Sequence, residues 1–457
     1  MDGAKKPFFK KFSQGYTFKV LMLVALVLLL LIPLNMIRGL VNERGRTAAS
    51  AESDIMEAWG KQLIEAGPVI TIPGIKTAEV RTKTEKEGEK IEIIKTPFTL
   101  VLSPKELVIN ADFKTEIRKR GIFSVPLFSG TLALSGSFDP AMAISALLPD
   151  EDISLNQAEL IISLSSQKGI RKINTSKWET SELFFQPGNR GHNLVSYGYS
   201  YNSKSGSGIY AALDHFENKA STFNINIEIQ GGQFIRVLPI GQDTHVSISS
   251  DWNSPSFQGA FLPGVSNITD NDFSASWDIS YLSRDIPLFW KEYSDGSDYT
   301  SSLFGVNFFR TIDTYALNTR AVKYAILFLI VPFLTLFLLE IFTKKRIHPA
   351  PYLLSGFGNA VFYLLLLSLS EQIPFYTAYL IAALAVTIMM TLYSRSLLPS
   401  WNKSWYMGLV VTISYILLYA VLNAESYALL IGSIGTFVVI ALVMFLTRKL
   451  DWYGQEE

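Results

Sequence analysis

The residue types that do chemistry are few in this chain and widely separated. Its 457 residues include no cysteine, which excludes disulfides, thiolate catalysis, cysteine metal sites and a lipidated N-terminal cysteine. The four histidines are His192, His215, His245 and His348. Asp243 and His245 are two residues apart, so on a strand their side chains share a face and could together bind a metal ion. An Asp-x-His triplet also arises easily by chance. No Walker A loop, H-E-x-x-H, G-x-S-x-G elbow or Rossmann glycine fingerprint occurs, so we assign no catalytic, cofactor-binding or metal residue and expect no cofactor.

Ionisable residues are also missing from the middle of the apolar segments, where an ion-coupled transporter would place them. Glu340, Glu371 and Glu425 all lie at segment ends. The deep polar residues are small or neutral: Ser355, Asn359, Ser368, Ser414, Gly432 and Gly435. Small residues let helix backbones approach, so close packing explains this set better than a transport path. Asn359 is the best candidate for a hydrogen bond between helices.

Uncharged runs of nearly equal length dominate the C-terminal third of the chain. Each is long enough to cross a bilayer, which takes about 20 apolar residues. One run contains Glu340, which lies one turn before Lys344 and can pair with it at the membrane edge. A further run lies near the N-terminus between Lys19 and Arg38. The six predicted transmembrane helices are 20–37, 324–343, 347–370, 372–394, 404–424 and 426–447.

The first run could instead be a cleavable signal peptide, because a basic region followed by an apolar stretch begins such peptides. The nearest small-x-small triplet, Ala49-Ser50-Ala51, lies well beyond the apolar run, and Arg38, Arg44 and Arg46 intervene. We therefore favour an uncleaved anchor.

Orientation follows from the basic residues, because short loops rich in lysine and arginine stay in the cytoplasm. The connection after the third predicted helix holds Glu371 as its charged residue, and the connection after the fifth holds Glu425. The two tails and the connections after the second and fourth helices are basic: Lys5, Lys6, Lys10, Lys11, Lys19, Lys344, Lys345, Arg346, Arg395, Lys403, Arg448 and Lys449. Arg320 and Lys323 are a mild exception beside a long translocated segment. The predicted segments are a cytoplasmic tail 1–19, an anchor 20–37, a periplasmic domain 38–323, a five-helix bundle 324–447 and a cytoplasmic tail 448–457.

The exported segment 38–323 has the pattern of a mainly β domain. An amphipathic stripe over 48–66 predicts a membrane-proximal helix. Short alternating or β-branched runs such as PVITIPGI and STFNINIEIQGG follow, divided by turn residues, and predict sandwich-like sheets. The run FFQPGNRGH at 184–192 could separate two domains, so one or two β domains remain open.

The charge of this segment restricts its partners. It holds 33 acidic and 28 basic residues. That balance does not favour nucleic acid or an anionic membrane surface. The partners we expect are the lipid bilayer around the helices and an envelope protein or glycan.

Long collinear stretches resemble the CreD family of inner-membrane proteins. The resemblance covers nearly the whole chain, and it departs from the family pattern at Thr311-Ile312 and Ala350-Pro351. The stretches that carry it include RKRGIFSVPLFSG from Arg118, DWNSPSFQGAFLPG from Asp251, RIHPAPYLLSGFGNAVFYLLLLSLSE from Arg346 and MFLTRKLDWY from Met444. It implies a Gram-negative inner-membrane protein linked to envelope integrity, envelope stress, the β-lactam response and colicin tolerance, with no catalytic residues.

Three functions remain open from the sequence. The first is a noncatalytic envelope protein whose periplasmic domain binds an envelope component, in which case Trp252, Phe257 and Phe261 could form an exposed patch rather than part of an ordinary core. The second is a transporter or channel component with a water-lined cavity reaching Asn359. The third is a hydrolase of envelope polymers, which would need a cleft with two carboxylates roughly 5–10 Å apart.

Overall fold

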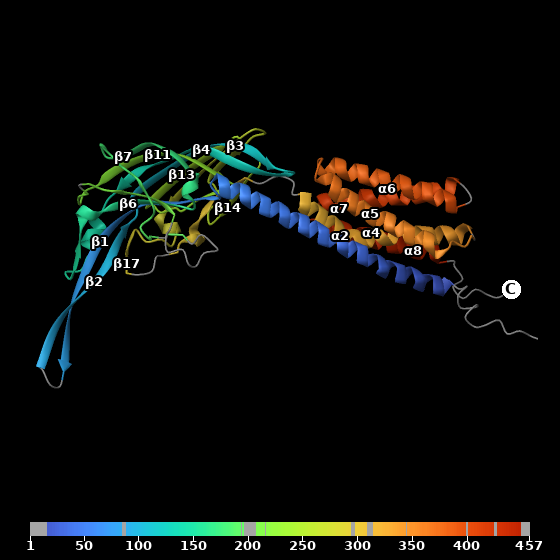
Figure 1. Cartoon of the computed structure of the whole chain (residues 1–457), viewed down its shortest axis with the longest axis horizontal. Coiled ribbons are helices and arrows are strands. Elements are labelled where there is room, and N and C mark those ends of the chain that lie inside the picture. Colours follow the sequence, from blue (N-terminus) through green and yellow to red (C-terminus); the bar gives the residue numbers. More distant parts are fainter. Residues whose placement is uncertain are drawn as a thin grey trace, which may run out of the picture. The chain divides into compact units, whose positions relative to one another are not determined.

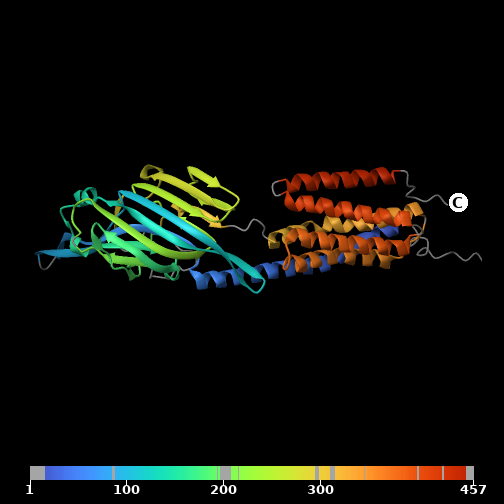
Figure 2. The same cartoon turned by 90° about the horizontal axis from the view of Figure 1, so that it is seen from above.

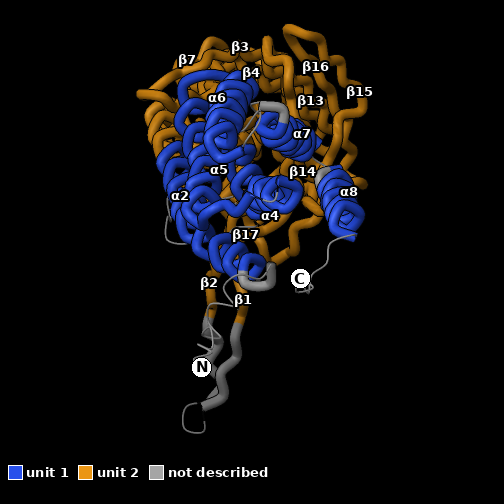
Figure 3. Tube along the Cα trace, turned by 90° about the vertical axis from the view of Figure 1, so that its right-hand side faces the viewer, with its two compact units in different colours: residues 1–49, 312–457 blue, residues 50–311 orange. Residues whose placement is uncertain are grey.

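The computed structural model describes residues 16–84, 88–192, 194–195, 207–214, 216–293, 298–308, 314–343, 345–398, 401–424 and 427–448. It divides into a helical unit, residues 1–49 and 312–457, and a β unit, residues 50–311 (Figure 3). The predicted architecture is confirmed, because a large β domain lies in the chain between the first and second of six membrane-length helices.

The helical unit consists of apolar helices that are long enough to cross a bilayer. Their spans without charge leave no polar face, as expected of helices that face lipid. They are α2 (Tyr16–Trp59), α4 (Thr314–Thr343), α5 (Pro349–Ser370), α6 (Phe375–Leu397), α7 (Trp401–Asn423) and α8 (Ala428–Thr447). His348 caps the start of α5, because it accepts a hydrogen bond from the backbone of Ala350 at 3.3 Å and Pro349 is the first residue of the helix.

Helices α4 to α7 pack as sequential neighbours, and α4 also packs against α7. Helix α2 joins them through a close approach at Gly356 of α5. A Cβ placed at Gly356 would lie 2.1 Å from Leu30 of α2 and 2.7 Å from Phe333 of α4. Leu30 is fully buried as a result. The small residue therefore lets three helices meet at one point.

An ion pair holds the start of α2 to the end of α4. Lys19 donates a hydrogen bond to one carboxylate oxygen of Glu340, and Tyr352 of α5 donates to the other oxygen at 2.7 Å. Glu340 thus pairs with another helix, whereas we expected Lys344, which lies outside the described residues. The contact between helices could not be read from local spacing.

A second ion pair ties α2 to α5 further along. Arg44 donates two hydrogen bonds to the carboxylate of Glu371 at 2.8 and 2.7 Å, and Tyr315 of α4 donates a third at 3.1 Å. Lys19 and Arg44 are about 38 Å apart along a helix that rises 1.5 Å per residue, which exceeds the hydrocarbon thickness of a bilayer. Both pairs therefore flank the uncharged run 20–37.

The β unit is a sandwich of two sheets (Figures 1 and 2). Within the described residues the first sheet contains β1 (Leu63–Thr84), β2 (Gly88–Leu102), β5 (Glu151–Ile153), β6 (Glu159–Leu164), β9 (Gln186–Pro187), β10 (Gly208–Ala212), β12 (Phe234–Val237), β14 (Pro255–Gly259), β17 (Phe289–Glu292) and β18 (Phe304–Phe308). The second contains β3 (Glu106–Arg120), β4 (Phe123–Phe138), β7 (Ile170–Trp178), β8 (Ser181–Glu182), β11 (Ser221–Gly232), β13 (Asp243–Ser250), β15 (Val265–Ile268) and β16 (Phe273–Ser280). A short helix α3 (Ala141–Ser145) and four 3₁₀ turns, Leu155–Gln157, Gln167–Gly169, Tyr281–Ser283 and Thr300–Ser302, connect them.

One hydrophobic core lies between the sheets. Strands such as β13 and β16 alternate buried and exposed residues, so one face of each packs inward. Aromatic rings meet across the core: the ring centres of Phe128 and Phe308 are 5.0 Å apart and those of Trp277 and Phe304 are 5.4 Å apart. Each such pair contributes about 0.5–1.5 kcal/mol beyond its buried area.

In the β unit one sequence expectation fails, and one alternative that the sequence left open is resolved. The helix expected over 48–66 ends at Trp59, because Gly60 and Lys61 adopt positive φ and both donate to the carbonyl of Met56, after which Leu63 opens β1. The run 184–192 separates no domains, since residues 50–311 form a single unit and Gln186 pairs with β10. Its glycines make a turn within that unit.

Glu65 is fully buried in the inter-sheet core. Among the described residues neither of its carboxyl oxygens has a hydrogen-bond partner, and burial raises the pKa of this carboxyl well above its usual range. Folding therefore favours the protonated form.

We expect Glu65→Leu to stabilise the protein by about 1–3 kcal/mol at neutral pH, because it removes an unpaired buried polar group. With a folded pKa above the unfolded value, stability is full below the unfolded pKa, near 4.5, and declines as pH rises toward the folded pKa. Denaturant unfolding of the full chain at several pH values measures both effects. The wild-type stability relative to Glu65→Leu should fall with pH, and a pH-independent difference would contradict the assignment.

Candidate functional site

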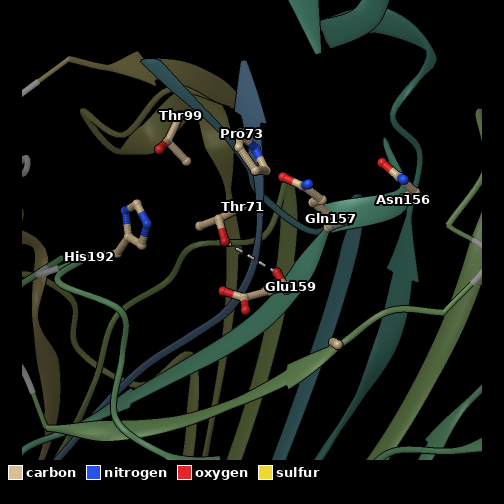
Figure 4. A pocket seen from close by; sticks show the side chains of 9 residues that line it. Thr71, Pro73, Thr99, Asn156, Gln157, Glu159 and His192 are labelled. Atoms are coloured by element: carbon tan, nitrogen blue, oxygen red, sulfur yellow. Dashed lines mark hydrogen bonds between the residues drawn. The ribbon is translucent and has the colours of Figure 1, made fainter. Parts of the chain in front are cut away.

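A polar cavity of about 340 Å³ opens on the β unit (Figure 4). Its wall carries two hydroxyls, two side-chain amides, a carboxylate and an imidazole. The lining residues are Thr71, Pro73, Thr99, Asn156, Gln157, Ala158, Glu159, His192 and Ala212. This is the candidate site in the β unit.

Strand register brings the floor of the cavity together. Thr71 of β1 pairs with Glu159 of β6, which in turn pairs with Ala212 of β10, while Pro73 of β1 pairs with Thr99 of β2. Residues two apart on a strand share a face, as do directly paired residues, so these five lie on one face of the sheet. The alternate residues of β1 point into the core, so the cavity lies on the outer face of the first sheet.

A tight loop at residues 188–192 brings His192 over that face. Gly188, Arg190 and Gly191 all adopt positive φ, a backbone conformation that the two glycines accept without strain. Asn189 is 1% exposed and fixes the loop, because its side chain accepts from the backbone of Gly191 at 3.1 Å and donates to the carbonyl of His192 at 2.9 Å.

His192 is oriented by Glu292 of β17. The Nδ1 atom of His192 lies 2.6 Å from one oxygen of Glu292, and the indole of Trp290 donates to the other oxygen at 2.9 Å. Burial alone would raise the pKa of Glu292. The hydrogen bonds from His192 and Trp290 lower it by more, so the pKa of Glu292 lies below its usual range. The ionised carboxylate accepts a hydrogen bond from Nδ1–H, which leaves Nε2 as the ring nitrogen without a partner among the described residues.

The carboxylate in the cavity wall, Glu159, is paired with an arginine. Arg190 donates to Glu159 at 2.9 and 3.2 Å, and its guanidinium lies 4.2 Å from the ring centre of Tyr210. Glu159 is the one carboxylate in the described lining, so the cavity does not present the pair of free carboxylates that glycoside hydrolysis uses. Its groups suit hydrogen bonding to a hydroxyl-rich ligand.

The histidines do not assemble a metal centre in the described residues, where no group of three His, Asp and Glu side chains clusters. His245 bonds to Asp278, its partner across β13 and β16, rather than to Asp243. His215 lies outside the described residues.

The three aromatic residues considered for an exposed patch belong to the core, which is the alternative that the sequence favoured. Trp252, Phe257 and Phe261 are half-buried and pack against it, and the ring of Phe257 meets Trp277 edge-on at 5.9 Å. Of the three, Phe257 lies on β14, and its ring packs toward the opposite sheet.

Asn359 makes the predicted hydrogen bonds between helices. It donates to the carbonyl of Phe328 on α4 at 2.9 Å and accepts from Tyr415 on α7 at 2.8 Å, and Tyr379 on α6 donates to the carbonyl of Tyr415 at 2.6 Å. At 2% exposure its amide is enclosed by packed helices rather than lining a water path. Of the small residues, Gly435 packs against Leu417, whereas Gly432 faces open space and does not mediate the expected packing.

Comparison with known proteins assigns nearly the whole chain to one family. A family model described as Inner membrane protein CreD matches residues 15–453. The chain belongs to the CreD family. Inner membrane protein CreD of Escherichia coli (strain K12) is 29% identical over 438 residues, which cover 95% of this chain and 93% of that protein. The resemblance read from the sequence is therefore confirmed.

Sequence reasoning missed the cavity of this CreD-family chain. His192 appeared as an isolated histidine because Glu292 lies 100 residues away. The available signal was the glycine-rich turn GNRGH, which we considered as a possible domain break. Such turns often carry functional side chains on a rigid scaffold.

The Asn359 network should stabilise the helical unit. We expect Asn359→Leu to cost about 1–2 kcal/mol, because it strands the hydroxyl of Tyr415 and removes the bond to Phe328. Asn423→Leu is the matched control, since Asn423 is exposed and bonds within its own helix, and it should cost less than about 0.5 kcal/mol. Unfolding in lipid-detergent micelles measures both, and equal losses would contradict a special role for Asn359.

Proposed function

We propose that this CreD-family protein supports the integrity of the cell envelope as a noncatalytic protein of the inner membrane. In this proposal both termini are cytoplasmic and residues 38–323 are periplasmic. The β unit binds a glycan of the envelope in the cavity beneath His192. The observation that carries the proposal is the cavity itself, a hydrogen-bonding site on the outer face of a rigid sheet.

The chemistry of the lining supports binding of a sugar. Sugar hydroxyls both donate and accept hydrogen bonds, and the threonine hydroxyls and the amides of Asn156 and Gln157 do the same. Polar groups of this kind orient a ligand in a pocket. The volume of about 340 Å³ is in the lower range for small-ligand sites.

Binding is favoured over hydrolysis by what surrounds His192. A general base must reach the proton that it removes, and within the described chain the His192 ring bonds to Glu292 alone. No described hydroxyl or carboxylate is hydrogen-bonded to Nε2 as a nucleophile. The His192–Glu292 pair is therefore a fixed hydrogen-bonding group for a ligand.

The distribution of charge supports the proposed orientation. Lys345 and Arg346 lie in the connection between α4 and α5 and Lys403 lies in the first turn of α7, whereas the connection between α5 and α6 holds Glu371. Basic short loops stay in the cytoplasm. That puts the β unit, which enters the chain after the first helix, on the opposite side.

The absence of cysteine makes the topology directly testable. Leu282→Cys introduces a thiol at an 80% exposed site of the β unit, and Ala350→Cys introduces one at the start of α5. In spheroplasts a membrane-impermeant maleimide should label the first and not the second until the membrane is opened. Labelling of the second alone would reverse the topology.

Filling the cavity should abolish glycan binding. We expect Thr99→Trp in the full chain to weaken binding of a peptidoglycan disaccharide by about tenfold or more, because the indole occupies the site and removes a hydroxyl. Thr96→Trp on the exposed part of the same strand is the control. Titration calorimetry measures both, and cells carrying Thr99→Trp should leak a periplasmic marker enzyme, as we also expect of cells lacking the protein. Unchanged binding would exclude the cavity, and cleavage of the disaccharide would exclude a noncatalytic role.

A further inference from the structure

An apolar groove of about 480 Å³ runs between α4, α7 and α8 of the helical unit. Its walls are hydrocarbon side chains over most of their length, including Val331 and Leu338 of α4, Val410 of α7, and Val439 and Leu442 of α8. This groove lies far along the chain from the β-unit cavity and is independent of the proposed function.

The packing of α8 explains why the groove exists. Gly435 lets α8 approach α7, since a Cβ there would lie 2.9 Å from Leu417. The apolar stretch of α8 is otherwise almost unburied: Leu429 is 84% exposed, Phe437 72% and Met444 67%. Helix α8 therefore packs against α7 on one side and leaves a gap between itself and α4.

The length of the groove suits an extended hydrocarbon chain. Its wall on α4 runs from Val331 to Phe342, about 16 Å at 1.5 Å per residue, which is about half the hydrocarbon thickness of a bilayer. The groove thus extends from one membrane edge toward the midplane, as one acyl chain of a single leaflet does.

The charged end of the groove identifies the headgroup. Lys403 and Tyr406 line the groove where α7 begins, beside Phe342 and Thr343 at the end of α4. Arg448 follows α8 at the same end, with its guanidinium 4.1 Å from the ring centre of Phe445. The nearby carboxylate of Glu340 already bonds to Lys19 and Tyr352. Among the described residues, the charge left at this end of the groove is positive.

We propose that the groove is a binding site for one anionic phospholipid. One acyl chain lies between α4 and α8, and the headgroup phosphate contacts Lys403. The lipid fills the gap that α8 leaves and so fixes α8 against the rest of the helical unit. A zwitterionic lipid with the same chains gains no net charge attraction and binds less tightly.

Native mass spectrometry of the full chain in mild detergent tests this site with phosphatidylglycerol, using phosphatidylcholine of the same acyl chains as the comparison. We expect one phosphatidylglycerol to remain bound preferentially. Lys403→Gln should weaken its binding about fivefold, the effect of one basic residue near an anionic headgroup. Lys323→Gln, at the opposite end of α4, should leave binding unchanged.

A second pair of variants tests the groove without altering charge. Val439→Trp fills the groove and should abolish retention of the lipid, whereas Val438→Trp, on the neighbouring 55% exposed position of α8, should not. Both change an apolar residue on a largely unburied helix, so neither disturbs a packed core. Retention by Val439→Trp equal to wild type would overturn the site. Equal retention of both lipids, or of phosphatidylglycerol by Lys403→Gln, would overturn the headgroup assignment, and a second copy of the chain in place of lipid would overturn the occupant.

Discussion

Hydrocarbon does not solvate charge, and the helical unit is arranged around that constraint. Its lysine, arginine and acidic residues lie at or beyond the ends of the apolar runs, and two of the acids, Glu340 and Glu371, each bond to a basic residue of α2 and to a tyrosine. The pairs form where the membrane ends, so they fix the depth of α2 against α4 and α5. Packing at Gly356 then sets how closely these helices approach.

The helical unit was readable from the sequence because its dominant interaction is local. Charge interrupts each apolar run at the point where its helix reaches water, so composition alone located six helices, and a lone deep amide, Asn359, marked its centre. What composition could not give was the partner of each charge. Glu340 bonds to a lysine 321 residues earlier, and proximity in sequence suggested Lys344 instead.

The β unit was readable in class but not in detail. Alternation of apolar residues indicated strands, yet their register depends on pairings between distant segments, such as the parallel pairing of β3 with β13. The candidate cavity arises from four neighbouring strands, the 3₁₀ turn before β6 and one loop, and of the strands only β1 and β2 are consecutive in the chain. The same dependence explains why the sequence left open whether Phe257 is exposed: which face of β14 turns inward is decided by the opposite sheet.

The cavity lies on the outer face of the first sheet, whereas the residues that hold the two sheets together lie on the inner face. Substitutions at Thr71 or Thr99 therefore need not touch the aromatic contacts of the core. The core residues and the residues that line the cavity can therefore change independently in evolution. Related chains can keep this sandwich while selection exchanges the groups that line the cavity, so the preference of the proposed glycan site need not follow overall sequence identity.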